Sequence, residues 1–270
     1  MSDPGTEDSA PVSGDEADLK EETPVIDVHA PHGGMHTWKD FWIHLGTIAA
    51  GLLIAISLEQ GVEALHRLHE RHQLETDLHA EALHNRDFAR LDIAIYDKVV
   101  VWLQEIQRGV DAERATGGKA VFVYPPRPDG IPDSPRYTAY HVLESEAWTT
   151  AKESSLLTLL PRDEAEIYTR VSFQADQVQE TRDRARELGI RQGGFETRFS
   201  SGTYPPVFDL TKLSAAQLDE YEALLADELE TVRIARVRLR IFAAANDYVL
   251  AGGTSEVDIR TAIMKANVSQ

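Results

Sequence analysis

Apolar and polar residues alternate with a helical period along most of this chain, but one block carries no charge at all. Residues 41–58 contain no Asp, Glu, Lys or Arg over 18 positions. As a helix this block would rise about 27 Å, close to the roughly 30 Å hydrocarbon core of a bilayer. Trp38, Phe41 and Trp42 crowd its start, as aromatic residues do at membrane interfaces. A helix in a soluble core usually keeps a polar stripe and this block has none, so we predict a transmembrane helix over residues 37–61.

Small residues repeat along one side of the predicted span. Thr47, Gly51 and Ala55 are spaced four residues apart. This spacing lets two helices approach closely in lipid, where packing drives their association. Small residues are also common in spans that do not pair. Self-association into a homo-oligomer through this helix-packing face is therefore a hypothesis.

The helix is expected to continue beyond the span. Residues 62–108 contain neither Gly nor Pro, the two strongest helix breakers. Steps of three and four define an apolar face in the distal half, which consists of Phe88, Leu91, Ile95, Val99, Trp102, Ile106 and Val110. We predict one uninterrupted helix that ends at Gly117-Gly118.

Further helices follow a proline-rich loop near residues 119–137, in which residues 121–124 favour a short strand. A helix is expected over 143–160, and another begins after Pro161 and meets the Gly193-Gly194 pair, which is typical of a helix end. Ser214 and Gln217 form a capping-box pattern that starts the last long helix. Its apolar stripe is heptad-like and comprises Leu218, Tyr221, Leu225, Val232, Leu239, Phe242 and Val249. Gly252-Gly253 ends this helix, and residues 255–266 form a short terminal one.

These patterns predict an all-α protein in which residues 62–270 fold as an antiparallel helical bundle. A single transmembrane helix continues into the first long helix of that bundle. Residues 1–36 are rich in Asp, Glu, Ser, Pro and Gly, and they bury too little apolar surface to offset the entropy of ordering. They are predicted to form a disordered acidic tail.

Charge and composition exclude several classes of function. The formal net charge is −18, from 45 acidic and 27 basic residues, which argues against binding of nucleic acid. The chain has no cysteine, so disulfide scaffolds, thiolate metal centres and cysteine nucleophiles are excluded. No nucleophile elbow, phosphate-binding loop or dinucleotide fingerprint occurs in the sequence. We therefore expect neither enzymatic activity nor a cofactor.

Histidine is the one anomaly in composition, because nine of the ten lie between His29 and His84. Imidazole is a zinc ligand and a pH-sensitive group near neutrality. His66, His69 and His72 are the candidate metal ligands, although spacing of three residues spreads them around a helix. A loose metal site in residues 29–36 is a further hypothesis. The Glu-x-x-His pairs at 63–66 and 81–84 lie about 27 Å apart on one helix and cannot share a metal within one chain.

Two parts of the sequence carry a family resemblance. They are Trp38-Lys39-Asp40-Phe41 with Leu58-Glu59-Gln60-Gly61-Val62-Glu63 around the span, and the later Glu146-Ala147-Trp148. The chain resembles an uncharacterised family of bacterial single-pass membrane proteins. The resemblance implies bacterial origin and membrane anchoring, and it brings no activity, cofactor or catalytic residue.

We therefore expect a membrane-anchored helical interaction or scaffold protein in the bacterial inner membrane, with the lipid bilayer and an unknown protein as partners. The alternative is a histidine-dependent metal-binding or pH-sensing membrane protein. Lysines and arginines flanking the span are too few to decide orientation. A single span before a long domain favours a cytoplasmic N-terminus and a periplasmic domain.

Overall fold

The structure is a computed structural model that describes residues 38–117, 124–126, 128–129, 141–200 and 208–268. Within these residues the chain forms five α-helices and two short 3-10 helices and no strand, which confirms the all-α prediction. The elements are α1 (Trp38–Thr116), α2 (Glu146–Glu153), η1 (Leu156–Leu159), α3 (Arg162–Arg198), η2 (Leu210–Lys212), α4 (Ala215–Leu250) and α5 (Glu256–Val268). The predicted tail over residues 1–36 and most of the proline-rich loop, including residues 121–123 of the predicted strand, lie outside the described residues.

The first helix is a single element of 79 residues, as the absence of Gly and Pro over 62–108 predicted. The chain divides into two units, Met1–Glu59 and Gln60–Gln270, and α1 contributes to both. Gly117 follows the helix with a φ of +61°, a left-handed conformation that glycine adopts without steric cost. The predicted helix end at this glycine is confirmed.

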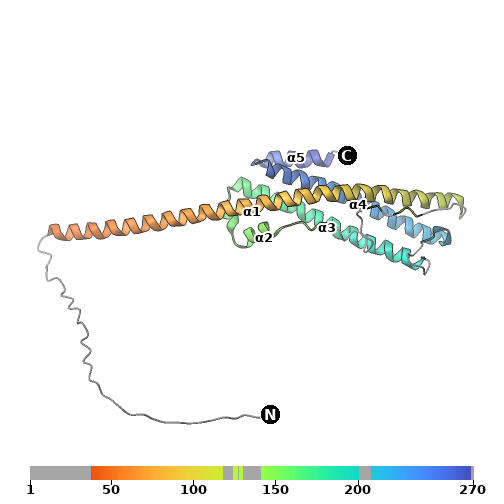
Figure 1. Cartoon of the computed structure of the whole chain (residues 1–270), viewed down its shortest axis with the longest axis horizontal. Helices are drawn as coiled ribbons and strands as arrows, with labels where there is room; N and C mark the ends of the chain where they lie inside the picture. The colour runs from red at the N-terminus through yellow and green to blue at the C-terminus, as the bar shows by residue number, and fades with distance from the viewer. Residues whose placement is uncertain (1–37, 118–123, 127, 130–140, 201–207, 269–270) are drawn as a thin grey trace, which may run out of the picture. The chain divides into compact units, whose positions relative to one another are not determined.

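Ion pairs between helices show how the second unit is arranged. Arg90 contacts Asp247 and Arg114 contacts Asp219, so α4 runs antiparallel to α1. Asp92 pairs with Arg182 and Arg71 lies 3.9 Å from Glu164, so α1 and α3 run in the same direction. The antiparallel arrangement that the sequence predicted therefore holds for α4 but not for α1 against α3. Within this unit α1, α3 and α4 lie side by side (Figure 1).

The core of the bundle consists of apolar faces from these three helices. All seven residues of the predicted α4 stripe are buried, from Leu218 to Val249. The capping box is also confirmed, since the Ser214 amide donates to Gln217 Oε1 at 2.8 Å and the Gln217 amide donates to Ser214 Oγ at 3.4 Å. Local sequence signals therefore predicted this helix and the face that it buries.

The turn after α4 depends on a close contact with one glycine. Tyr248 packs over Gly253, where an added Cβ would lie 2.3 Å from the tyrosine ring. The Tyr248 hydroxyl donates to the Ser255 carbonyl and accepts from the Ser255 amide, at 2.9 and 2.8 Å. The first glycine of the Gly252-Gly253 pair adopts a φ of +73° in the turn, and the second is required by its packing against Tyr248.

Three sequence predictions need correction. The helix expected over 143–160 is broken, because Ser155 adopts a φ of +62° between α2 and η1. Gly193-Gly194 does not end a helix; α3 continues to Arg198, because Phe195 is fully buried and stacks on Tyr221 with ring centroids 5.3 Å apart. Leu91, expected on the apolar face of α1, is 53% exposed, and the buried residue beside it is Asp92.

Candidate functional site

The apolar segment of α1 is the first candidate functional feature. Of the helices that the structure describes, α1 alone contains a window of 18 residues long and apolar enough to cross a membrane, and none of that window is buried. Trp38, Phe41 and Trp42 contact one another at its start, with ring centroids 5.5–6.4 Å apart. Thr47 Oγ1 donates to the Ile43 carbonyl at 2.9 Å, so its hydroxyl is satisfied within the helix. A helix with this surface exposes apolar side chains that water does not solvate well.

The predicted packing face in this segment is open. Thr47, Gly51 and Ala55 are exposed, and a Cβ added to Gly51 would meet no atom within 4 Å. The close approach of another helix would therefore meet only small side chains along this line.

The candidate metal ligands are not gathered into a site. His66 Nε2 lies 3.0 Å from Glu70 Oε1, whereas the His72 side chain is exposed on another side of the helix. His69 lies at the edge of a groove described below. Across the described part of the chain, no group of three or more His, Asp or Glu side chains could hold a metal ion. His29, His32 and His36 lie outside the described residues.

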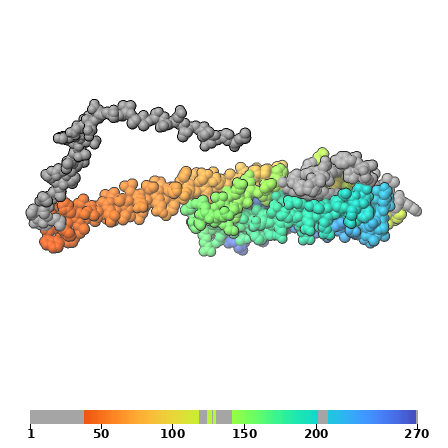
Figure 2. Space-filling model, turned by 90° about the horizontal axis from the view of Figure 1, so that it is seen from below, coloured from red at the N-terminus to blue at the C-terminus, as the bar shows by residue number. Residues whose placement is uncertain are grey.

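Polar residues of α1 instead hold the segment that leads into α2. The Asn85 side chain donates to the Glu144 carbonyl and accepts from the Glu144 amide, both at 2.8 Å. Glu81 Oε2 accepts from the Ala147 amide at 2.8 Å, and so caps the N-terminus of α2, where the N-cap residue Ser145 makes no such bond. Burial raises the pKa of the Glu81 carboxyl, although its bonds to backbone amides oppose the shift. These contacts attach residues 141–148 to α1 on the side of the molecule shown in Figure 2.

A buried ionic cluster lies further along α1, seven residues after Asn85. Asp92 is fully buried and pairs with Arg182 of α3, which is 4% exposed. The other Asp92 oxygen lies 2.8 Å from His141 Nδ1, and Arg182 also donates to the His141 carbonyl at 3.1 Å. Burial raises the pKa of Asp92, although the hydrogen bond from His141 and the charge of Arg182 both act to lower it. The cluster joins α1, α3 and the segment before α2 at one point.

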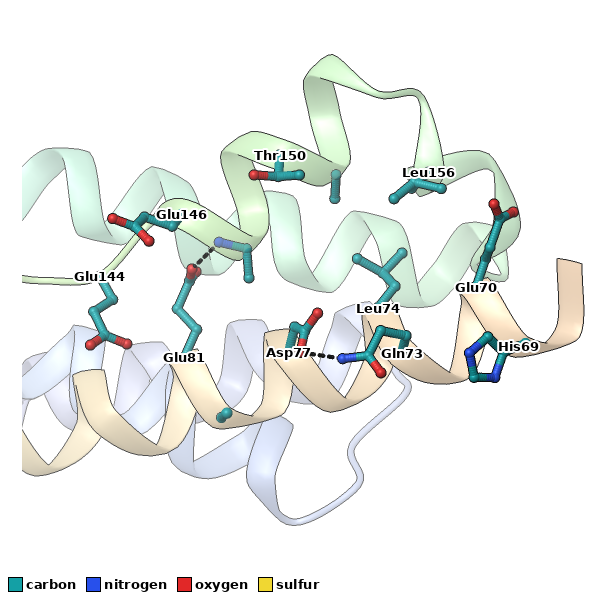
Figure 3. A pocket seen from close by; sticks show the side chains of 13 residues that line it. His69, Glu70, Gln73, Leu74, Asp77, Glu81, Glu144, Glu146, Thr150 and Leu156 are labelled. Atoms are coloured by element: carbon teal, nitrogen blue, oxygen red, sulfur yellow. Dashed lines mark hydrogen bonds between the residues drawn. The ribbon is translucent and has the colours of Figure 1, made fainter. Parts of the chain in front are cut away.

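A groove of about 610 Å³ opens between α1 and the segment formed by α2 and η1 (Figure 3). Its carboxylates are Glu70, Asp77, Glu81, Glu144 and Glu146. Four of them already have partners: Glu70 contacts His66, Asp77 accepts from Gln73, Glu81 caps α2, and Glu144 lies 3.2 Å from His84. The groove is acidic, but most of its carboxylates are already bound to other residues of the same chain.

Two arginines in the second half of α4 have partners on another helix of the bundle. Arg236 donates to Asp97 at 2.9 Å and Arg240 lies 3.9 Å from the same carboxylate. Both cross from α4 to α1, so these arginines join two helices of the bundle.

Comparison with known proteins assigns the chain to no family. No family model matches the chain, and no characterised protein and no solved structure matches it.

Sequence reasoning missed the residues that hold the helices together. Asp92, Arg182 and His141 are far apart in the chain, and His141 is the one histidine outside the cluster that drew attention. The only signal that could have found Asp92 is an acidic residue in line with apolar positions of its helix, with Ala89 and Tyr96 buried on either side.

Proposed function

We propose that this protein is a single-pass membrane protein of the bacterial inner membrane whose helical bundle serves as an interaction module. In this proposal the apolar segment of α1 crosses the bilayer and residues 62–270 form the water-exposed domain. The proposal takes the N-terminus to be cytoplasmic and the domain periplasmic.

One observation carries the anchoring. An apolar window of 18 residues with no buried residue is unlike a core helix, which would be covered by neighbouring elements. Burying these side chains in lipid removes them from water, and a helix satisfies its backbone hydrogen bonds within itself.

The interaction role is supported by how the bundle uses its polar residues. Glu81, Asn85, Asp92 and Arg182 all make contacts that join helices or cap them. Groups engaged in this way are held in place for stability and are poorly suited to proton transfer or nucleophilic attack. The bundle is therefore better suited to presenting a surface than to catalysing a reaction.

Membrane fractionation tests the anchoring directly. The wild-type chain should remain in the membrane pellet after an alkaline carbonate wash. Leu53→Arg places a charge in the apolar window at a cost of about 3 kcal/mol for insertion and should shift protein to the supernatant. Ala64→Arg, an exposed position of the same helix outside the window, is the matched control and should stay in the pellet. Wild-type protein in the supernatant would refute the proposal.

Orientation is tested with single cysteines, because the chain has none of its own. Asp227→Cys lies on the exposed side of α4, and Ser9→Cys lies before the span. A maleimide reagent that does not cross the inner membrane should label Asp227→Cys in cells with a permeabilised outer membrane and leave Ser9→Cys unlabelled. The reverse pattern would invert the proposed topology.

A further inference from the structure

The outer side of α1 carries a continuous line of residues without Asp, Glu, Lys or Arg, which we call the neutral stripe. It consists of Val62, Leu65, His69, His72, Thr76, His79 and Leu83, and all seven are exposed. Val62, Leu65 and Leu83 are 63%, 69% and 42% exposed, so the stripe leaves large apolar side chains in water. The face of α1 that packs into the bundle is a different one and is formed here by Leu74, Leu78 and Ala82. Leu83 lies five residues from Leu78, which places it about 140° around the helix, away from that core.

Charge is distributed around this part of α1 in an unusual way. Residues 60–83 contain seven charged side chains in a chain that is strongly acidic overall, and none of them is on the stripe. Two ion pairs along the helix engage four of them, Arg67 with Glu63 at 3.1 Å and Arg71 with Glu75 at 2.6 Å, and His66 Nε2 lies 3.0 Å from Glu70 Oε1. Water-facing sides of surface helices are normally the charged ones, so an exposed and uncharged side indicates a surface that is covered in the assembled protein.

The spacing of the stripe indicates what kind of surface covers it. Its seven residues follow one another in alternating steps of three and four, which is the spacing of the a and d positions of a heptad repeat. This repeat places side chains for knobs-into-holes packing against another helix of the same period. In the sequence, the same register continues backwards to Leu58, Ala55 and Gly51, two of which belong to the small-residue spacing predicted for helix association.

We infer that a second copy of this chain covers the neutral stripe, so that two α1 helices pair in parallel along residues 62–83; this inference rests on the membrane anchoring proposed above. Anchoring fixes two copies in the same direction and holds equivalent residues at the same height. Each stripe residue then meets its own equivalent across a two-fold axis, as an isologous interface requires.

A second copy fits this stripe better than a charged partner does. A neutral line at every a and d position brings no like charges together when it meets itself, whereas a stripe carrying Glu or Lys would repel its copy. The charges flanking the stripe are largely paired along their own helix and do not require an oppositely charged partner. Histidine and threonine at four of the seven positions weaken the pairing relative to leucine but set its register.

Cysteine crosslinking tests the inference in the full chain, where any introduced cysteine is the only one. Leu65→Cys and Leu83→Cys on the stripe should form disulfide-linked dimers under mild oxidation in native membranes. Ala64→Cys, exposed and adjacent but off the stripe, is the matched control and should crosslink at least roughly tenfold less, because its Cβ atoms would lie too far apart. Equal crosslinking at positions 64 and 65, or an adduct of Leu65→Cys with another protein, would overturn the inference.

A charge placed within the stripe provides the second arm. His72→Glu, made in the Leu83→Cys background, brings two carboxylates together and should reduce crosslinking at position 83 by roughly tenfold or more. Ala64→Glu in the same background should leave it unchanged. Both substituted positions are exposed, so far-ultraviolet circular dichroism should show unchanged helicity for both variants.

The same membranes are also washed with carbonate, which separates the two proposals. Protein that stays in the pellet without crosslinking refutes the pairing and leaves the anchoring intact. Protein that is released but still crosslinks at positions 65 and 83 refutes the anchoring and retains the pairing.

Discussion

Removing the buried charge of Asp92 should destabilise the bundle far more than removing an exposed charge from the same helix. Asp92→Asn keeps the size of the side chain but deprives Arg182 of its anionic partner. Both groups are buried, at 0% and 4% exposure. Asp97→Asn, five residues along α1, is the matched control, because Asp97 pairs with Arg236 of α4 at 2.9 Å but is 47% exposed.

The magnitude follows from this difference in burial. Breaking a buried ion pair by changing one partner costs about 3–5 kcal/mol, because the remaining charge stays in a poorly solvated site. An exposed pair contributes at most about 1 kcal/mol, since water and salt screen it. For a domain of this size, a loss of 3–5 kcal/mol lowers the midpoint of thermal unfolding by about 6–20 °C.

The assay is urea unfolding of the detergent-solubilised full chain, followed by far-ultraviolet circular dichroism. A double substitution, Asp92→Leu with Arg182→Met, completes the experiment, since replacing both charges by apolar groups should recover most of the loss. If Asp92→Asn costs no more than Asp97→Asn, or if the double variant is as unstable as the single one, the reasoning from burial is wrong.

Three further predictions concern other parts of α1. Asn85→Ala removes both bonds to the Glu144 backbone and should cost about 2 kcal/mol in urea unfolding, with faster proteolytic cleavage in residues 141–148; unchanged cleavage would contradict the role assigned to Asn85. Burial raises the pKa of Glu81 above 4.5, so the folded chain binds this proton more tightly than the unfolded chain and the free energy of unfolding falls as pH rises just above 4.5. Glu81→Gln should remove that part of the slope in urea titrations at several pH values, and an unchanged slope would show that other groups cause it. Gly51→Leu should weaken self-association of the isolated segment 37–61 in a bacterial two-hybrid assay, and an undiminished signal would argue against the small-residue face.

The boundaries and faces of individual helices were largely predictable because they depend on nearby residues. The capping box at Ser214 and the heptad stripe of α4 act within one or a few turns, and the structure confirms both. The apolar block at 41–58 is likewise a local property, and it appears as a segment of α1 with no buried residue.

Predictions failed where distant contacts outweighed a local preference. Two adjacent glycines cost a helix about 2 kcal/mol relative to alanine, yet α3 continues through Gly193-Gly194 because Phe195 is buried among other aromatic side chains. The contact of Asp92 with Arg182 joins residues 90 positions apart, and no local pattern identifies such a pair.

The sequence by itself determined that this is a helical protein with one uncharged apolar segment between two acidic regions. Only the tertiary structure decided which side of residues 62–83 packs into the core and which remains in contact with water. Leu74, Leu78 and Ala82 are covered by the bundle, whereas Leu65 and Leu83 are exposed. Helical periodicity indicates that a face is apolar. Whether that face is buried depends on what packs against it, here helices such as α3 and α4 that begin at least 80 residues further along the chain.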